Sequence, residues 1–409
     1  MHPQLQRTAQ PETEVWSLYR KALTLLAAIA VIFDGFDIQI LGFAIPSIMK
    51  EWHVTRAQLA PVAALGLTGM ALGSPFAGWC GDRFGRRVTL IGCIGIFAIA
   101  TLATAFCGNL TELAILRTLA GLGAGGALPN AGALVAEFAP LRRRAMAVSL
   151  TIVCVPLGGM LAGVIAGRVL PAFGWRMLYI VGGAAPLVFA LILLAVLPES
   201  PDYQARAEGK GSLRDLFAVD LRRDTLGLWL AFFSCLGGIY LVFSWLPAML
   251  TARGMDIATA SAGLASYNFG GVLGVLMIVA VVTAIGSRGP LLIAALAGSA
   301  SALALLWAPG SLLIAGLGLH GLFVNAAQTT MYALAAHVYP PRIRATGIAC
   351  SAAIGRCGGI LSSLGGAAII QRGSTAYLGV LGLAFAVTFV GLAIVRNHCP
   401  GRHEQRRHA

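Results

Sequence analysis

Charged side chains are scarce in this chain of 409 residues, since only 11% are Asp, Glu, Lys or Arg while 58% are hydrophobic. A water-soluble protein of this length would lack the polar residues needed to cover its surface. We therefore expect the lipid bilayer to surround most of the chain. Acidic residues are scarcer still, with 16 Asp and Glu against 29 Lys and Arg. The bases lie in short clusters between apolar runs, as in the cytoplasmic loops of membrane proteins, so we set nucleic-acid binding aside.

Cysteine pairs are also lacking. The eight cysteines include no C-x-x-C pair, so we expect neither a disulfide framework nor a metal site. No cofactor loop and no pairing of a nucleophile with a base is present either, which argues against an enzyme and against a bound cofactor. A cleavable signal peptide is absent as well. Residues 1–16 are polar and partly acidic, and the first apolar segment is expected to remain as an uncleaved anchor.

Apolar segments of about the length needed to span a bilayer, roughly 20 residues, fill the rest of the chain. They lie near residues 22–48, 59–79, 88–106, 112–138, 145–170, 177–197, 225–249, 258–285, 290–308, 311–338, 345–370 and 376–396. A polar stretch divides them six and six, which is the layout of transporters built from two six-helix halves. The sequence thus predicts an all-α membrane protein with twelve transmembrane helices.

The predicted organisation has five parts. They are an N-terminal segment at 1–21, a six-helix half at 22–197, a central loop at 198–224, a second six-helix half at 225–396 and a basic tail at 397–409. Most lysines and arginines fall on the side that also carries the central loop and both ends of the chain. By the positive-inside rule, both termini are cytoplasmic and the protein is a multi-pass protein of the cell inner (plasma) membrane.

A glycine-rich turn connects the second and third apolar segments. It runs from Gly78 to Arg87 and contains one acid, Asp82, among several bases. Its glycines let neighbouring backbones approach closely, and its acid can meet a helix N-terminus or an arginine. The turn resembles the major facilitator superfamily signature G-x-L-A-D-R-x-G-R-R, with Cys80 in place of the usual aliphatic residue. The matching residues are Gly78, Asp82, Arg83, Gly85, Arg86 and Arg87.

The resemblance extends over essentially the whole chain and implies the major facilitator fold. It also implies a gate on the cytoplasmic side. Glu137 ends the fourth apolar segment, close in sequence to the Arg142–Arg144 triplet, and we interpret it as part of this gate together with Asp82 and Arg86. Simple solvation of Glu137 in a loop is the alternative. The corresponding loop of the second half, 286–290, has lost its acid, so any gate there must be weaker or built differently.

Ionisable residues inside the apolar segments are candidates for function, because a charge at bilayer depth is costly unless it is paired or hydrated. Asp34 and Asp37 are three residues apart and share one face of the first segment. At about 1.5 Å per residue, Arg117 on the fourth segment reaches nearly the same depth. Neighbouring carboxylates oppose double ionisation, so this cluster could carry a coupling proton. A static ion pair between the two segments is the alternative, and it leaves the second acid unexplained.

Several short motifs resemble those of the aromatic acid:proton symporters within the superfamily. They are Asp34–Asp37 in the first segment, Glu137–Pro140 after the fourth, and Arg344–Gly347 with Gly355–Gly358 in the eleventh. The resemblance implies inward transport of benzoates, hydroxybenzoates or related aryl acids together with protons.

Arg356 is the candidate ligand for such a carboxylate. It lies about 17 Å into the eleventh segment, near the bilayer midplane, and a guanidinium matches a carboxylate with two parallel donors. Polar and aromatic residues of neighbouring segments could complete a cradle for a planar aryl acid. These further candidates are His320, Tyr267, Asn268, Tyr240, Asn325 and Gln328.

Each of these residues also has a purely structural interpretation. Arg356 could bond to backbone carbonyls, His320 could be a satisfied interior histidine, and Tyr240 could pack at the membrane interface. Asn325 and Gln328 could line the inner half of the path or bond between helices.

The sequence as a whole predicts a proton-coupled secondary transporter that imports a small aromatic carboxylate by alternating access. Its partners would be that carboxylate, protons and the lipid bilayer, and we expect it to function as a monomer. Three alternatives remain open: symport of another organic anion, such as a sugar acid or dicarboxylate, proton-driven export, and a transporter-like sensor. The exporter motif is matched only in part by Pro156–Gly159. A sensor would not need intramembrane charges in both halves.

Overall fold

The computed structural model describes residues 17–140, 144–198, 216–218, 221–340 and 343–401, and all regular structure within them is helical. The first five helices are α1 (Leu18–Trp52), α2 (Arg56–Phe84), α3 (Arg86–Thr104), α4 (Leu110–Phe138) and α5 (Arg144–Val196). The other six are α6 (Arg222–Ala252), α7 (Ile257–Ile285), α8 (Arg288–Ala304), α9 (Gly310–Val338), α10 (Arg344–Gln371) and α11 (Ser374–Ile394). The all-helical architecture predicted from the sequence is confirmed.

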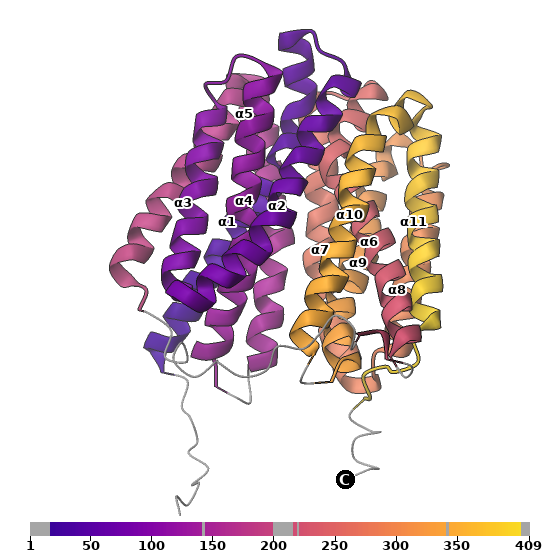
Figure 1. Cartoon of the computed structure of the whole chain (residues 1–409). Coiled ribbons are helices and arrows are strands. Elements are labelled where there is room, and N and C mark those ends of the chain that lie inside the picture. The colour runs from indigo at the N-terminus through magenta and orange to yellow at the C-terminus, as the bar shows by residue number, and fades with distance from the viewer. Residues whose placement is uncertain (1–16, 141–143, 199–215, 219–220, 341–342, 402–409) are drawn as a thin grey trace, which may run out of the picture.

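The helices form two bundles side by side, α1–α5 and α6–α11, called here the first and second halves (Figure 1). The beginning of α1 and the end of α11 lie at the same face of the molecule, called here the terminal face, at the bottom of Figure 1. In the described residues, ten helices are long and apolar enough to cross a membrane, and α8 is a shorter apolar helix. Most of the central loop, most of the two chain ends, Arg142 and Arg143, and the side chain of Asp82 lie outside the described parts.

Helix α5 is interrupted near its middle. It has 53 residues, but Gly174 takes the non-helical angles φ 76° and ψ 178°, so two helical segments meet there. A left-handed φ is readily adopted by glycine, which has no Cβ to clash with the backbone. The bend turns the chain back at the face opposite the termini, called here the far face. The break agrees with the sequence, which placed two separate apolar segments on either side of it.

Small residues let the helices of each half pack backbone to backbone. A Cβ added to Gly121 of α4 would collide with the Gly66 carbonyl of α2, and one added to Gly270 of α7 would collide with the Gly318 carbonyl of α9. Such contacts are typical of membrane helices, which associate through close packing because lipid offers no hydrophobic driving force between them. The same device at equivalent places gives both halves a rigid core.

Candidate functional site

The carboxylate of Asp37 is held inside the first half. Arg117 Nη1 of α4 lies 3.3 Å from Asp37 Oδ1 and forms an ion pair with it. The Thr101 hydroxyl of α3 donates to the same oxygen. Arg117 Nη2 in turn donates to Thr101 Oγ1 over 2.8 Å and to Thr104 Oγ1 over 3.3 Å. All four side chains are buried, so the pair is enclosed by partners that offset its desolvation.

An aromatic ring completes the surroundings of Arg117. Its guanidinium carbon lies 4.9 Å from the ring centroid of Tyr179, on the second segment of α5, within the range of a cation–π contact. The sequence analysis identified neither Tyr179 nor the two threonines. A usable signal was present for the threonines, because Thr101 and Thr104 are three residues apart in an otherwise apolar helix and therefore share one face.

Asp34 has different surroundings although it is only one turn away. Its side chain is 1% exposed, and in the described parts of the chain its Oδ1 atom has no hydrogen-bond partner. The charges that act on it are those of Asp37 and, from the second half, Arg356. Arg117 thus forms its ion pair with Asp37, whereas the arginine whose charge acts on Asp34 is Arg356.

Arg356 on α10 lies among groups of both halves. Its charge acts on Asp34 of α1, on Tyr240 of α6 and on Tyr332 of α9. The Arg356, Tyr240 and Tyr332 side chains are each partly exposed, whereas Asp34 is buried. A cation and two phenol groups therefore gather opposite a buried acid, where the two halves meet. Tyr332 was not among the predicted residues, but it follows Gln328 by one helical turn and so lies on the same face of α9.

The remaining predicted binding residues lie elsewhere in the second half or at its boundary. His320 is fully buried, and its Nδ1 atom lies 3.1 Å from the Gly298 carbonyl and 3.0 Å from Ser301 Oγ. Its ring packs between Tyr267, at 5.9 Å between centroids, and Phe385, at 5.6 Å. This environment is that of an interior histidine of α9 that packs against α7, α8 and α11.

Two predicted amides bond within or between helices. Asn325 donates to the Gly321 carbonyl one turn earlier on α9, over 2.9 Å. Asn268 bonds to Gln39 of α1 through both atoms of its carboxamide. Gln328 is half-buried. Gln39 was missing from the predicted residues, although it is an amide in the first apolar segment, only two residues after Asp37.

The glycine-rich turn links four helices of the first half at the terminal face. Gly85, with φ 98°, separates α2 from α3. Arg86 Nε lies 3.3 Å from Glu137 Oε1 at the end of α4, and the Glu137 side chain is only 2% exposed. Arg87 Nη2 donates to the Leu194 carbonyl of α5 over 2.6 Å. Arg83 lies over the rings of Trp79 and Phe84.

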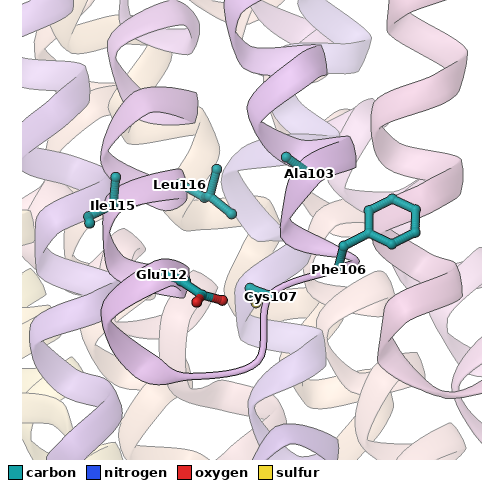
Figure 2. Close-up of a pocket in the computed structure, with 6 residues that line it drawn as sticks. All are labelled: Ala103, Phe106, Cys107, Glu112, Ile115 and Leu116. Atoms are coloured by element: carbon teal, nitrogen blue, oxygen red, sulfur yellow. The ribbon is translucent and has the colours of Figure 1, made fainter.

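A small hollow lies between the end of α3 and the start of α4 (Figure 2), and its lining residues are Ala103, Phe106, Cys107, Glu112, Ile115 and Leu116. Its one charged group, Glu112, already accepts hydrogen bonds from the Gly108 amide and from Asn109 Nδ2, each over 2.8 Å. These bonds cap the start of α4, so this hollow offers no free polar group to a ligand.

The family model described as Major Facilitator Superfamily matches residues 27–311 and 228–408 of the chain. The chain belongs to the major facilitator superfamily. This confirms the assignment made from the glycine-rich turn, and the facilitator is thus a membrane transport protein.

Curated relatives of this facilitator span nearly its whole length. The gallate transporter of Pseudomonas putida is 32% identical, over 91% of this chain and 89% of its own. The 4-hydroxybenzoate transporter PcaK of Pseudomonas aeruginosa is 34% identical, over 87% of this chain and 88% of its own. The 3-(3-hydroxy-phenyl)propionate transporter of Escherichia coli is 32% identical, over 92% and 93%. All three are named as transporters of aromatic acids and not as enzymes, so the predicted resemblance to the aromatic acid symporters is confirmed.

Solved structures show the same fold for this facilitator. A crystal structure of a D-xylose-proton symporter superposes with a TM-score of 0.78 at 19% identity, over 93% of this chain and 98% of that one. The inward-open xylose transporter XylE of Escherichia coli gives a TM-score of 0.76 at 18% identity, over 94% and 98%.

Proposed function

We propose that this facilitator imports a small aromatic carboxylate together with protons, by alternating access between its two halves. Relatives at 32–34% identity that are named for gallate, 4-hydroxybenzoate and 3-(3-hydroxy-phenyl)propionate support the substrate class. The fold shared with a D-xylose-proton symporter is compatible with the transport mode, although that likeness concerns the fold alone.

The observation that carries the proposal is that the charge of Arg356, on α10 of the second half, acts on Asp34, on α1 of the first half. Burial and the charge of Asp37 oppose ionisation of Asp34, and with no substrate bound the guanidinium of Arg356 acts against both. A substrate carboxylate that binds Arg356 brings a second negative charge toward Asp34, and two close carboxylates in a medium of low dielectric constant oppose double ionisation. Asp34 then takes up a proton. Substrate and proton therefore bind together, which is the requirement for symport.

Asp37 has a supporting role in this proposal. It is held by Arg117 and Thr101 within the first half and adds its negative charge to the surroundings of Asp34. That charge further favours the protonated form of Asp34 once substrate is bound. We therefore retain Asp34, Asp37 and Arg117 as the coupling residues, with Asp34 as the residue that gains and loses the proton.

The ring of the substrate would lie against the phenol groups near Arg356. Tyr240 and Tyr332 flank the guanidinium and are partly exposed, so they can contact a planar ligand edge to face. Gln328, on the same face of α9 as Tyr332, can reach a ring substituent. The buried positions of His320, Tyr267 and Asn325 fit a supporting shell better than direct contact.

The membrane arrangement is part of the proposal. We propose twelve spans, with α5 crossing twice because it bends at Gly174, and with α8 crossing once despite its 17 residues. The even number puts both termini on one side, and the many basic residues there make that side the cytoplasm of the inner membrane. A monomer is sufficient, because both halves of the path belong to one chain.

The cytoplasmic gate would be built around the glycine-rich turn. The residues proposed for it are Gly78, Asp82, Arg83, Gly85, Arg86, Arg87 and Glu137. The ion pair from Arg86 to α4 and the hydrogen bond from Arg87 to α5 hold this turn at the terminal face. When the halves close on that face, the turn is positioned to meet the second half.

Substrate counterflow in proteoliposomes tests the proposed function. Purified protein should exchange labelled 4-hydroxybenzoate or gallate across the membrane, and an inwardly directed proton gradient should concentrate it. Exchange of sugar acids or dicarboxylates instead would assign a different organic anion. Movement of the substrate in the direction opposite to the proton gradient would assign export. Specific binding without exchange would assign a sensor.

A further inference from the structure

A reciprocal pair of hydrogen bonds joins the two halves. Gln39 Nε2 donates to Asn268 Oδ1 over 3.1 Å, and Asn268 Nδ2 donates to Gln39 Oε1 over 2.7 Å. Gln39 belongs to α1 of the first half and Asn268 to α7 of the second. Both side chains are 0% exposed. Two carboxamides that pair in this way satisfy a donor and an acceptor on each side, so neither is left unpaired in the interior.

The Gln39 carboxamide is confined by its neighbours. Gly159 of α5 lies directly against it, and a Cβ added there would come within 2.5 Å of Gln39 Cδ. Asn268 is fixed from its own side, because Nδ2 also donates to the Leu264 carbonyl one turn earlier, over 2.9 Å. The glycine thus leaves room for the amide of α1, and the helix backbone orients the amide of α7.

Close contacts between the halves continue from this pair toward the far face. A Cβ added to Gly163 of α5 would lie 2.6 Å from Ala265 Cβ of α7. One turn further, Gly167 lies opposite Ala258 of α7, and a Cβ added to this glycine would lie 3.8 Å from the Ala258 carbonyl oxygen. Gly42 of α1 similarly faces the Phe243 carbonyl of α6. The amide pair thus belongs to a series of contacts between the halves that runs toward the far face.

We propose that the Gln39–Asn268 pair is a latch that closes the substrate path at the far face and opens whenever substrate enters from that face. The proposal rests on the proposed alternating access, because α1 and α7 must then separate in every cycle. Neutral amides suit such a latch. When the latch opens, each amide can replace its partner by water. When it closes, the two neutral groups pay a smaller desolvation penalty than two charged groups would. In this role Gln39 and Asn268 are positioning residues that set the balance between closed and open far face, and Asn268 is not a ligand of the substrate.

The test is amide hydrogen exchange, measured by mass spectrometry on the full-length protein in nanodiscs without substrate. The variants are Gln39→Leu, Asn268→Leu, the double Leu variant, and the exchanged pair Gln39→Asn with Asn268→Gln. The exchanged pair keeps one amide on each helix and the same summed side-chain length. Each single Leu variant removes two hydrogen bonds that favour the closed state. The exchange rate at the far-face ends of α1 and α7 should therefore rise by roughly 5- to 100-fold.

Three further outcomes define the latch. The double Leu variant should raise exchange no more than either single variant does, because only the single variants leave a buried carboxamide without a partner. In the exchanged pair, the exchange rates should return toward those of the parent protein. The terminal-face ends of α1 and α7 should keep their parental exchange, whereas general destabilisation would raise exchange along the whole of both helices. Unchanged exchange at the far face, or additive effects of the two Leu substitutions, would overturn the proposal.

The result does not depend on the substrate. If counterflow with aromatic acids fails but the exchange pattern holds, the proposed substrate class is wrong and the latch stands. If counterflow succeeds while the exchange pattern is absent, the transport function stands and the latch does not.

Discussion

The two acids of α1 differ in what holds them, although they lie one turn apart. Asp37 accepts from Thr101 and pairs with Arg117, and both partners belong to its own half. Asp34 has an oxygen without a hydrogen bond and faces the charge of Arg356 from the other half. A group that must gain and lose a proton during transport needs few fixed partners, whereas a group that fixes the architecture needs many. These contacts support the proposed division of roles, in which Asp34 carries the proton and Asp37 is its fixed charged neighbour.

Asparagine at each position should separate these two roles. Asp34→Asn removes the titrating group, so uptake driven by a pH gradient should be lost while substrate exchange survives. Asp37→Asn leaves the buried guanidinium of Arg117 without its carboxylate, a loss that usually costs about 3–5 kcal/mol. Thermal unfolding of the purified variants, together with gradient-driven uptake, distinguishes them. If both variants still concentrate substrate under a pH gradient, the proton is carried elsewhere.

Arg356 should contribute to binding through its shape as well as its charge. Arg356→Lys keeps the charge but loses the two parallel donors, so affinity should fall markedly. Arg356→Ala should cost more, on the order of 2–5 kcal/mol, as for other buried charge pairs that lose one partner. The check compares binding of a benzoate-type acid and its neutral amide by parent and Ala proteins. An equal preference for the acid in both proteins would show that Arg356 does not hold the carboxylate.

At the scale of elements, the chain segment after α11 packs against the α7–α8 loop, which lacks the acid of the glycine-rich turn. Ser287 of that loop donates its amide to the Cys399 carbonyl over 3.0 Å, and its Oγ accepts from the Cys399 amide over 2.9 Å. Asp224, at the start of α6, accepts from the amides of Arg396 and Asn397. The sequence analysis expected a gate built differently at this loop. The structure shows a strap, residues 395–401, that ties the ends of α6, α7, α8 and α11 together.

This strap should loosen as the pH falls. Burial lowers the pKa of His398 from its usual 6.5, and the charges of Arg288 and His337 lower it further. The hydrogen bond to the Val395 carbonyl and the charge of Asp224 raise this pKa, but they do not cancel the effect of burial. The docked strap therefore favours neutral His398. It is fully stable above about pH 6.5 and loses stability as the pH falls below that value, because the undocked histidine takes up its proton first.

Hydrogen exchange of residues 395–401 at pH 7.5 and 5.5, corrected for the intrinsic rates, measures this effect. Protection should fall at the lower pH in the parent protein. His398→Asn, which cannot titrate, should give similar protection at both values. Equal pH dependence in the two proteins would contradict a role for His398.

Depth along a helix could be predicted from the sequence, but the direction of a side chain could not. Counting residues placed Asp34, Asp37 and Arg117 at one level, and the structure joins Asp37 to Arg117. The same count could not show that Asp34 faces the second half, because the rotation of α1 depends on its packing against α5 and α6. Asn268 was likewise predicted as a substrate contact from its depth, which says nothing of the direction of its side chain. Its partner, Gln39, lies 229 residues away, and no local pattern relates the two.

At the scale of the whole molecule, transport requires the two faces to close in turn. Close contacts between the halves run from the Gln39–Asn268 pair toward the far face in this structure. The terminal face must then close when the far face opens. The glycine-rich turn lies at that face, and the pair of Arg86 with Glu137 fixes it to α4. The turn can therefore move with the first half as one body and meet the second half when that face closes.

Replacing Glu137 should thus impair transport without impairing substrate binding. Glu137→Gln weakens the link from α4 to the turn, which lies at the terminal face, far from Arg356 near the middle of α10. We expect the transport rate to fall by at least about tenfold, the effect of about 1.4 kcal/mol, while the Kd of the substrate stays within about threefold. Glu112→Gln, at the opposite end of the same helix, is the matched control, because Glu112 caps α4 at the far face and should leave transport nearly unchanged. Counterflow rates and equilibrium binding of the three purified proteins decide the matter. Lost binding in a correctly folded Glu137→Gln protein would show that this acid acts on the substrate site and not on closure of the terminal face.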